Sequence, residues 1–388
     1  MNTSPATRAM PAEPTDFPPA PVAPGYRIGY LDSVRGLAAF TVLVYHFIGW
    51  RWATELPTKL AFIVVNGSDA VSLFFVLSGL VLSWRYFQEP AGTAPVPITW
   101  PAYRRYLTSR VIRLYGPFLI ALALHYLYVH RNDAIDVLLH DFFTNRYAWF
   151  EEALLIRGKH DHYLPAWTLE VEVAGSLLLP FMVLLLRHDR RLFLAFQVVA
   201  LVLGGSFVFW GLFHFGLGLW LAYYYRAIST YDLRRVWWYR GRWGVYAAVF
   251  LFFGIRHIAK IWPFGSAFDY VMGLLRLDMF HLTGLAAAAL LAIVINRPRL
   301  QRVLAIRPLV FLGTISYGVY LLHWLFVVGV MDKWDTYAAR FGGEPRAYWV
   351  LLALTVAATL IASTIFYYVV ERPCIRLGKR VAAALGRE

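Results

Sequence analysis

The chain has 388 residues, of which 59% are hydrophobic and only 15% are charged, which excludes an ordinary soluble domain with about a quarter of its residues charged. A formal net charge of +14 would suit a nucleic-acid-binding protein. In so apolar a chain it indicates loops that lie near anionic lipid headgroups, and we expect no nucleic-acid partner. The single cysteine excludes an internal disulfide and a cysteine-based metal cluster, and we expect no bound metal.

Ten apolar segments predict an all-α protein, a polytopic transmembrane helical bundle with about ten spans. The expected spans are residues 33–50, 60–83, 112–130, 167–187, 192–209, 211–226, 243–259, 270–295, 308–331 and 347–370. Before them, residues 1–28 are rich in proline and alanine, and we expect a disordered cytoplasmic tail without a cleavable signal peptide. We expect one transmembrane domain over residues 29–376 and a short basic cytoplasmic tail over residues 377–388.

The distribution of basic residues orients these spans. With the N-terminus in the cytoplasm, most of the 37 Lys and Arg residues fall in inside segments, as the positive-inside rule requires. The fifth and sixth spans are short and almost continuous, but merging them would reverse every later span and spoil this asymmetry. We therefore expect both termini in the cytoplasm and Arg35 at the cytoplasmic surface.

The first predicted span carries two ionisable side chains on one face. Arg35 and His46 are eleven residues apart, which is about 1100° of helix and within roughly 20° of three full turns. The same spacing separates them by roughly 16 Å along the axis, so His46 lies at or beyond the middle of the hydrocarbon layer. An ionisable residue there is costly unless it faces the bundle interior or a wet cavity, which makes His46 a candidate functional residue. The alternative is a helix-end arginine and a buried, hydrogen-bonded histidine.

A basic pair opens the third span. Arg110 and Arg113 are three residues apart and share a helix face. Guanidinium groups bind phosphates with forked geometry, and a helix N-terminus adds partial positive charge. Together with Arg35 they form a candidate cradle for a phosphorylated cosubstrate. The alternative is that these arginines only set the topology.

The segment before the fourth span and the start of that span combine acids with aromatics. Tyr147, Trp149 and Phe150 stand among acidic residues in the long loop 131–166, where they could stack on sugar rings or form an ordinary interfacial segment. Glu170 and Glu172 follow in W-T-L-E-V-E, and two residues two apart cannot share a helix face. Only one faces the bundle, and the deeper Glu172 needs a partner there. The alternative is that both acids hydrate the helix start.

Two later spans also carry polar side chains. Ser316, Tyr320 and His323 are spaced i, i+4 and i+7, so they form one polar stripe that lines an interior or bonds other helices. In the eighth span, Asp278 and His281 are three apart and could pair. A structural pair and a functional site both remain open for these two residues.

Six motifs, in this order, make the chain resemble the acyltransferase-3 family of bacterial integral-membrane O-acyltransferases from about Tyr30 to Arg376. They are the R-x10-H pair Arg35 and His46, S-L-F-F-V-L-S-G-L at 72–80, the R-x-x-R pair Arg110 and Arg113, W-T-L-E-V-E at 167–172, S-Y-G-V-Y-L-L-H at 316–323 and E-R-P at 371–373.

The chain departs from the family in two places. Ser72 stands where many members carry an Asp, so any role of that Asp passes to another group, such as Asp69 or Glu172. The fused extracytoplasmic esterase-like domain of some members is also absent, so we expect the membrane domain alone to complete the transfer.

The resemblance implies transfer of an acyl group, most often acetyl, from cytoplasmic acyl-CoA to a hydroxyl of a surface or exported glycan or a lipid-linked sugar. It also implies a bacterial cytoplasmic (inner) membrane location, with membrane lipids and polysaccharide assembly machinery as further partners. We assign to acyl-CoA binding Arg35, Arg110, Arg113 and Ser78, and to catalysis His46, Glu172, Tyr320 and His323. In this scheme His46 is the general base and Glu172 orients its ring. The oxyanion donor is Tyr317, Tyr320, Ser78 or His323.

Other classes stay open at this point. A transporter could move acyl groups, lipids or glycans without chemistry, although we find no clear internal repeat of the kind that transporters often show. A non-catalytic partner in a glycan export complex is a third class. Within the enzyme class, His46 either activates the acceptor directly or is itself acylated in a relay, and we favour direct transfer.

Overall fold

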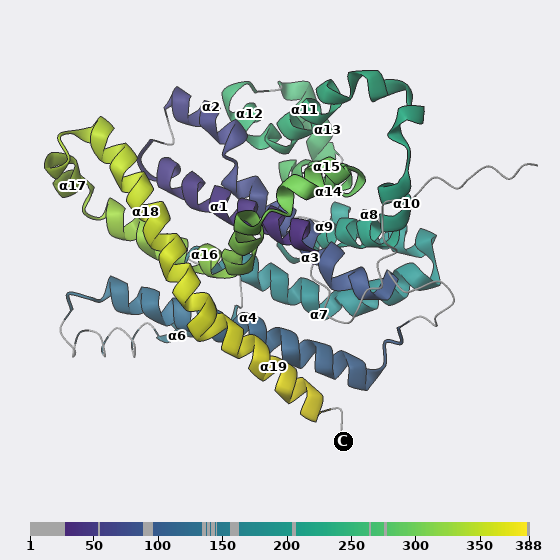
Figure 1. The fold of residues 1–388 in the computed structure, drawn as a ribbon, viewed down its shortest axis with the longest axis horizontal. Helices are drawn as coiled ribbons and strands as arrows, with labels where there is room; N and C mark the ends of the chain where they lie inside the picture. Colours follow the sequence, from purple (N-terminus) through teal and green to yellow (C-terminus); the bar gives the residue numbers. More distant parts are fainter. Residues whose placement is uncertain are drawn as a thin grey trace, which may run out of the picture.

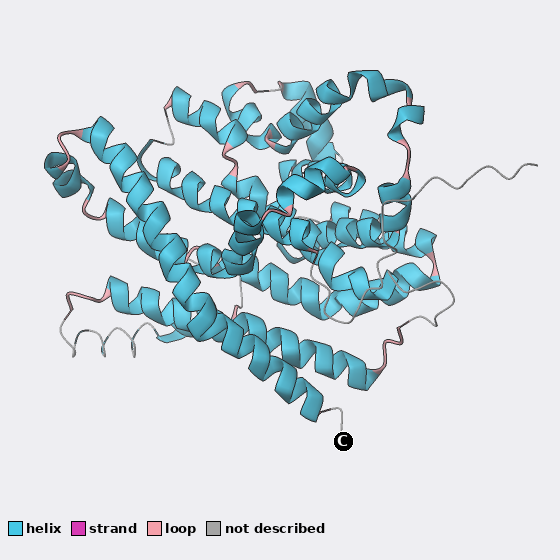
Figure 2. Ribbon diagram, in the orientation of Figure 1, coloured by secondary structure: helices cyan, strands magenta, loops and turns pink. Residues whose placement is uncertain are grey.

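The computed structural model describes residues 28–52, 55–87, 96–133, 137, 140, 144, 146–155, 163–203, 207–263, 265–274 and 278–385. In this part of the chain the secondary structure is helical and has no strands, which confirms the all-α bundle (Figures 1 and 2). The helices are α1 Gly29–Trp52, α2 Leu56–Val64, α3 Gly67–Phe87, α4 Trp100–Val129, α6 Arg146–Leu154, α7 Ala166–His188, α8 Arg190–Val202, α9 Phe207–Tyr223, α10 Tyr225–Thr230, α11 Arg242–Phe253, α12 Ile255–Ile261, α13 Ser266–Leu274, α14 Met279–Asn296, α15 Pro298–Leu304, α16 Arg307–Met331, α17 Trp334–Arg340, α18 Glu344–Phe366 and α19 Arg372–Ala384.

Within the described residues, seven helical stretches are long and apolar enough to cross a membrane. They are Gly29–Trp50, Leu56–Phe87, Trp100–Val129, Ala166–His188, Met279–Asn296, Arg307–Met331 and Arg346–Ala384. An eighth is obtained if Trp237–Phe253 and Ile255–Ile261, bent by 72° with respect to each other, form one broken span. Helices α8 and α9 stand at two of the expected spans but have only 13 and 17 residues. Ten spans and two cytoplasmic termini therefore stay a prediction.

Helices α1 and α16 form the centre of the bundle and touch along their backbones. A carbon placed as a side chain on Gly36 of α1 would lie 2.5 Å from the backbone nitrogen of Gly313 on α16, so only glycine allows this approach. The two helices run in parallel, because Arg35 bonds to Ser316 near their starts and His46 bonds to His323 further along. This register brings the first and the fifth sequence motif together.

Helix α3 packs between α1 and α9, and α7 packs against α3, α4 and α9. Helix α19 crosses α4 in the lower part of Figure 1. Between α18 and α19 the chain makes one π-helical turn, Tyr367–Glu371, which inserts an extra residue into the helical repeat. Helix α19 then continues past the expected domain end at residue 376, and that boundary stays a prediction, as does the tail at residues 1–27, which lies outside the described residues.

The pair Asp278 and His281 caps the start of α14. The Phe280 N–H donates to Asp278 Oδ1 at 3.1 Å, and the Asp278 N–H donates to His281 Nδ1 at 2.9 Å. Both interactions satisfy backbone N–H groups that a helix start leaves unpaired. The spacing of these two residues is thus explained by helix capping.

Candidate active site

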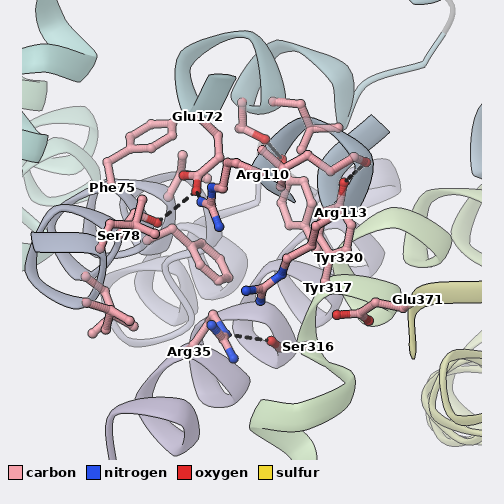
Figure 3. A pocket seen from close by; sticks show the side chains of 18 residues that line it. Arg35, Phe75, Ser78, Arg110, Arg113, Glu172, Ser316, Tyr317, Tyr320 and Glu371 are labelled. Carbon is pink, nitrogen blue, oxygen red and sulfur yellow. Dashed lines mark hydrogen bonds and ion pairs between the residues drawn. The ribbon is translucent and has the colours of Figure 1, made fainter. Parts of the chain in front are cut away.

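A cavity of about 130 Å³ lies between α1, α3, α4, α7, α16 and the π-helical turn (Figure 3). We call it the inner cavity. Each of the six sequence motifs contributes polar side chains to its wall, which are Arg35, Ser78, Arg110, Arg113, Thr168, Glu172, Ser316, Tyr317, Tyr320 and Glu371. The rest of the wall is apolar and includes Val71, Phe75 and Leu169. Residues from distant parts of the sequence therefore meet at one mostly buried space.

An ion pair between Arg110 and Glu172 crosses one side of the inner cavity. Arg110 Nη2 donates to Glu172 Oε1, and the Ser78 hydroxyl donates to the same oxygen at 3.2 Å. Arg110 Nε also donates to Ser176 Oγ at 3.0 Å. The two charged side chains are only 11% and 14% exposed. Arg110 is thus the partner that the depth of Glu172 required.

Two further arginines and a second carboxylate face the same space. Arg35 donates to Asp32 Oδ1 at 2.7 Å, to Ser316 Oγ at 3.1 Å and to the Gly313 carbonyl at 3.2 Å. In Figure 3 its guanidinium group points toward the same space as those of Arg110 and Arg113. The carboxylate of Glu371 approaches from the π-helical turn and is almost fully buried. The inner cavity therefore combines several cations with fewer anions, which suits an anionic ligand.

Glu371 is a site residue to which the sequence assigned no role, although it stands in the E-R-P motif. A regular α-helix through residues 344–384 would keep a repeat of 3.6 residues, and the extra residue of the π-helical turn changes which side chain faces inward. Such turns are frequent at functional sites. The motif is the only signal by which sequence alone could have found this residue.

A second cavity of about 580 Å³ adjoins the first, and Leu82, Arg110 and Arg113 line both. We call it the vestibule. Its wall consists of Leu82, Arg85, Val96, Pro97, Thr99, Ala102, Arg105, Tyr106, Ser109, Arg110 and Arg113. Four arginines and, among the described lining residues, no acid give this space a strongly positive field. Ligand cavities of enzymes measure roughly 300–1,000 Å³, so the vestibule has the size of a substrate site.

A fifth arginine shapes the vestibule wall. Arg187 of α7 donates to the Val96 carbonyl at 2.8 Å and to the Tyr86 carbonyl at 2.5 Å. These bonds tie residues 96–99, which precede α4, to the end of α3. The wall of the vestibule is therefore fixed by the fold, although part of it lies outside regular helices.

His46 lies next to the inner cavity rather than in its wall. His46 Nδ1 is 3.1 Å from His323 Nε2, and the two ring planes lie 22° from parallel with centroids 5.1 Å apart. Tyr320, which does line the cavity, contacts His323 with ring centroids 5.7 Å apart. The ring next to His46 Nδ1 is thus that of His323. Glu172, which we expected to orient His46, instead accepts hydrogen bonds from Arg110 and Ser78. The polar stripe Ser316, Tyr320 and His323 is buried, as expected from its spacing.

The remaining candidates from the sequence lie elsewhere or are incompletely described. Ser72 bonds Thr283 at 3.1 Å, and the fully buried Asp69 pairs with Arg256 at 2.9 Å, away from the inner cavity. Of the two carboxylates considered in place of the missing Asp, Glu172 is the one on the cavity. The side chains of Tyr147 and Trp149 lie outside the described residues, and the role of their loop stays open.

Comparison with known proteins agrees with the motifs. The family model described as "Acyltransferase domain" (Acyl_transf_3) matches residues 28–368. The chain is 25% identical to "Acyltransferase MdmB" of Streptomyces mycarofaciens over 91% of this chain and 93% of that protein. It is also 25% identical to "O-acetyltransferase PaAT-1" of Phomopsis amygdali over 49% of this chain and 47% of that protein. No solved structure matches.

The family model covers far more than half of the chain, and both relatives carry acyltransferase names. The transport and assembly-partner alternatives are set aside on this ground. An arginine-rich cavity system with a histidine pair beside it is consistent with that assignment. The chain belongs to the acyltransferase-3 family and is an acyltransferase that transfers groups other than aminoacyl groups.

Proposed function

We propose that the protein transfers a short acyl group, with acetyl as the first choice, from cytoplasmic acyl-CoA to a hydroxyl of a glycan or lipid-linked sugar. His46 is the general base of this reaction. The observation that carries the proposal is an inner cavity that shares Leu82, Arg110 and Arg113 with an arginine-lined vestibule. The same cavity is linked to the His46–His323 pair through Tyr320.

The donor fits this arrangement by charge and by shape. The phosphates of CoA would bind in the vestibule to Arg85, Arg105 and Arg113, because guanidinium groups form charge-assisted, forked hydrogen bonds with phosphate. The pantetheine arm would pass Leu82 into the inner cavity, since that residue lines both spaces. The inner cavity has less than a quarter of the volume of the vestibule, which favours a short acyl group.

The chemistry requires a base and a group that stabilises an oxyanion. His46 takes the proton of the acceptor hydroxyl while the oxygen attacks the thioester carbonyl. The tetrahedral intermediate then collapses: the carbon–sulfur bond breaks, and the departing thiolate receives the proton from His46. The product is an ester on the acceptor together with free CoA. This direct transfer needs donor and acceptor to be bound at the same time.

Hydrogen bonding favours Tyr320 as the oxyanion donor. The hydroxyl of Tyr317 donates to the Leu114 carbonyl at 2.7 Å, and that of Ser78 donates to Glu172. Thr168 Oγ1 lies 2.8 Å from the Tyr320 hydroxyl and 3.1 Å from the Pro165 carbonyl, and it has one hydrogen to donate. When Thr168 donates to Tyr320, the hydrogen of Tyr320 is free to point into the cavity that this side chain lines. Preorganised donors of this kind strengthen as negative charge develops on the carbonyl oxygen.

Release of free CoA by the purified protein in detergent tests the proposal. With acetyl-CoA and a panel of glycan acceptors, the wild type should release CoA in proportion to the ester formed. A His46→Ala variant should still bind acetyl-CoA but turn over almost nothing. Near-normal turnover by this variant would contradict the role of His46, and CoA release that depends on no hydroxyl acceptor would contradict the proposed reaction.

A further inference from the structure

The two histidines of the site form a hydrogen-bonded pair whose direction the backbone fixes. His323 Nδ1 lies 2.6 Å from the carbonyl oxygen of Tyr320, and His323 Nε2 lies 3.1 Å from His46 Nδ1. A carbonyl oxygen only accepts, so His323 Nδ1 must carry a hydrogen and donate it. In a neutral imidazole the other nitrogen then carries a lone pair, and His323 Nε2 is an acceptor.

The same reasoning decides which nitrogen of His46 carries the hydrogen. Since His323 Nε2 accepts, His46 Nδ1 must carry the hydrogen of the shared bond. The remaining nitrogen of His46, Nε2, then holds the lone pair, which is the state a general base needs. The order of donors and acceptors therefore runs from a main-chain carbonyl through one ring to the other, and it ends on a basic nitrogen.

The surroundings hold this pair in place. His323 is 1% exposed, and the backbone contact between Gly36 and Gly313 fixes the distance between the helices that carry the two rings. The two ring planes lie within 22° of each other, which suits a hydrogen bond between nitrogens whose lone pair and N–H lie in the ring planes. The carboxylate that could have served as an orienting group, Glu172, is bound by Arg110.

We propose that His323 is a positioning residue that keeps His46 in the tautomer with its lone pair on Nε2. This inference rests on the proposed function, in which His46 is the base. The competing explanation is that His323 only links α1 to α16, in which case its loss should lower stability and leave the chemical step of the folded fraction unchanged. The two explanations differ in kcat, which can be measured on folded protein.

Three substitutions at position 323 separate these explanations. In His323→Gln the side-chain amide oxygen reaches the place of Nε2 and can accept the His46 hydrogen. In His323→Asn, a matched polar control, the amide reaches only the place of Nδ1, and His323→Leu removes both functions. We expect kcat to fall by roughly 10²-fold in the Asn and Leu variants, which is the lower end of what a positioned base contributes. The Gln variant should recover at least about tenfold of this loss.

Each variant is measured with acetyl-CoA and a saturating acceptor, together with its thermal unfolding and its affinity for CoA. The KM values and the CoA affinity should stay within about threefold of wild type, because His323 lines neither the inner cavity nor the vestibule. If folded His323→Leu keeps kcat within about threefold while His46→Ala is inactive, the positioning role is wrong and the proposed function stands. Equal kcat values for the Gln and Asn variants would also overturn it. If His46→Ala itself turns over normally, the proposed function fails first.

Discussion

Arg113 allows the sharpest test of how the donor is bound, because it lines both the vestibule and the inner cavity. A charge-assisted hydrogen bond from arginine to phosphate contributes about 1.5–3 kcal/mol, so Arg113→Ala should weaken CoA binding by about ten- to a hundredfold. Arg113→Lys should restore part of this loss, since lysine keeps the charge but loses the forked geometry. Arg104→Ala is the matched control, because Arg104 is an exposed arginine of the same helix that lines neither cavity.

The assay measures equilibrium binding of CoA, of CoA lacking its 3′-phosphate and of pantetheine to each variant in detergent. If the vestibule binds the phosphates, the affinity difference between wild type and Arg113→Ala should disappear for pantetheine, which has no phosphate. An unchanged CoA affinity in Arg113→Ala, or an equal loss for CoA and pantetheine, would refute the placement of the donor. Raising the ionic strength should also reduce the difference, because vestibule arginines are partly exposed to solvent.

Four further outcomes are expected. Arg110→Ala should cost about 3–5 kcal/mol of stability, because it leaves the carboxylate of Glu172 buried without its charged partner. Replacing both residues by leucine should recover most of this loss, and thermal unfolding of Arg110→Ala that matches wild type would contradict the expectation. Gly36→Ala should force α1 and α16 apart at a cost of about 1–3 kcal/mol and lower kcat, and an unchanged kcat would show that the contact does not hold the histidines. Without acceptor, rapid quenching should detect no burst of free CoA, whereas a stoichiometric burst with an acyl adduct on His46 would establish the relay. A reporter fused at Asp133 should lie outside, and a cytoplasmic location would separate Arg35 from the arginines of α4.

The sequence predicted which residues belong to the site better than it predicted their partners. Depth in the membrane indicated that Glu172 needs a partner, but nothing local identified Arg110, which lies 62 residues away on another helix. The spacing of the stripe on α16 correctly predicted that His323 is buried, yet its contact with His46 depends on how two distant helices pack. Long-range register of this kind is set by tertiary packing, which a single sequence does not display.

Helix periodicity also has a definite limit in this chain. The apolar repeat identified the long helices, including the stretch that contains α18, because a helix of constant pitch keeps one face toward the bundle. It could not place Glu371, since this residue belongs to the π-helical turn, where the pitch changes. Nor could composition distinguish a straight span from the bent pair α11 and α12, whose 72° angle arises at Gly254.

The unequal sizes of the two cavities have a consequence for how such an enzyme can diversify. The nucleotide end of the donor would bind in the vestibule. The length of the acyl group would be limited by the apolar wall of the inner cavity, at Val71 and Phe75 of α3. Substitutions at these two positions can therefore alter the accepted chain length without touching an arginine. The same membrane scaffold could in this way acquire a new acyl specificity by a few exchanges on one helix face, with its affinity for the shared carrier conserved.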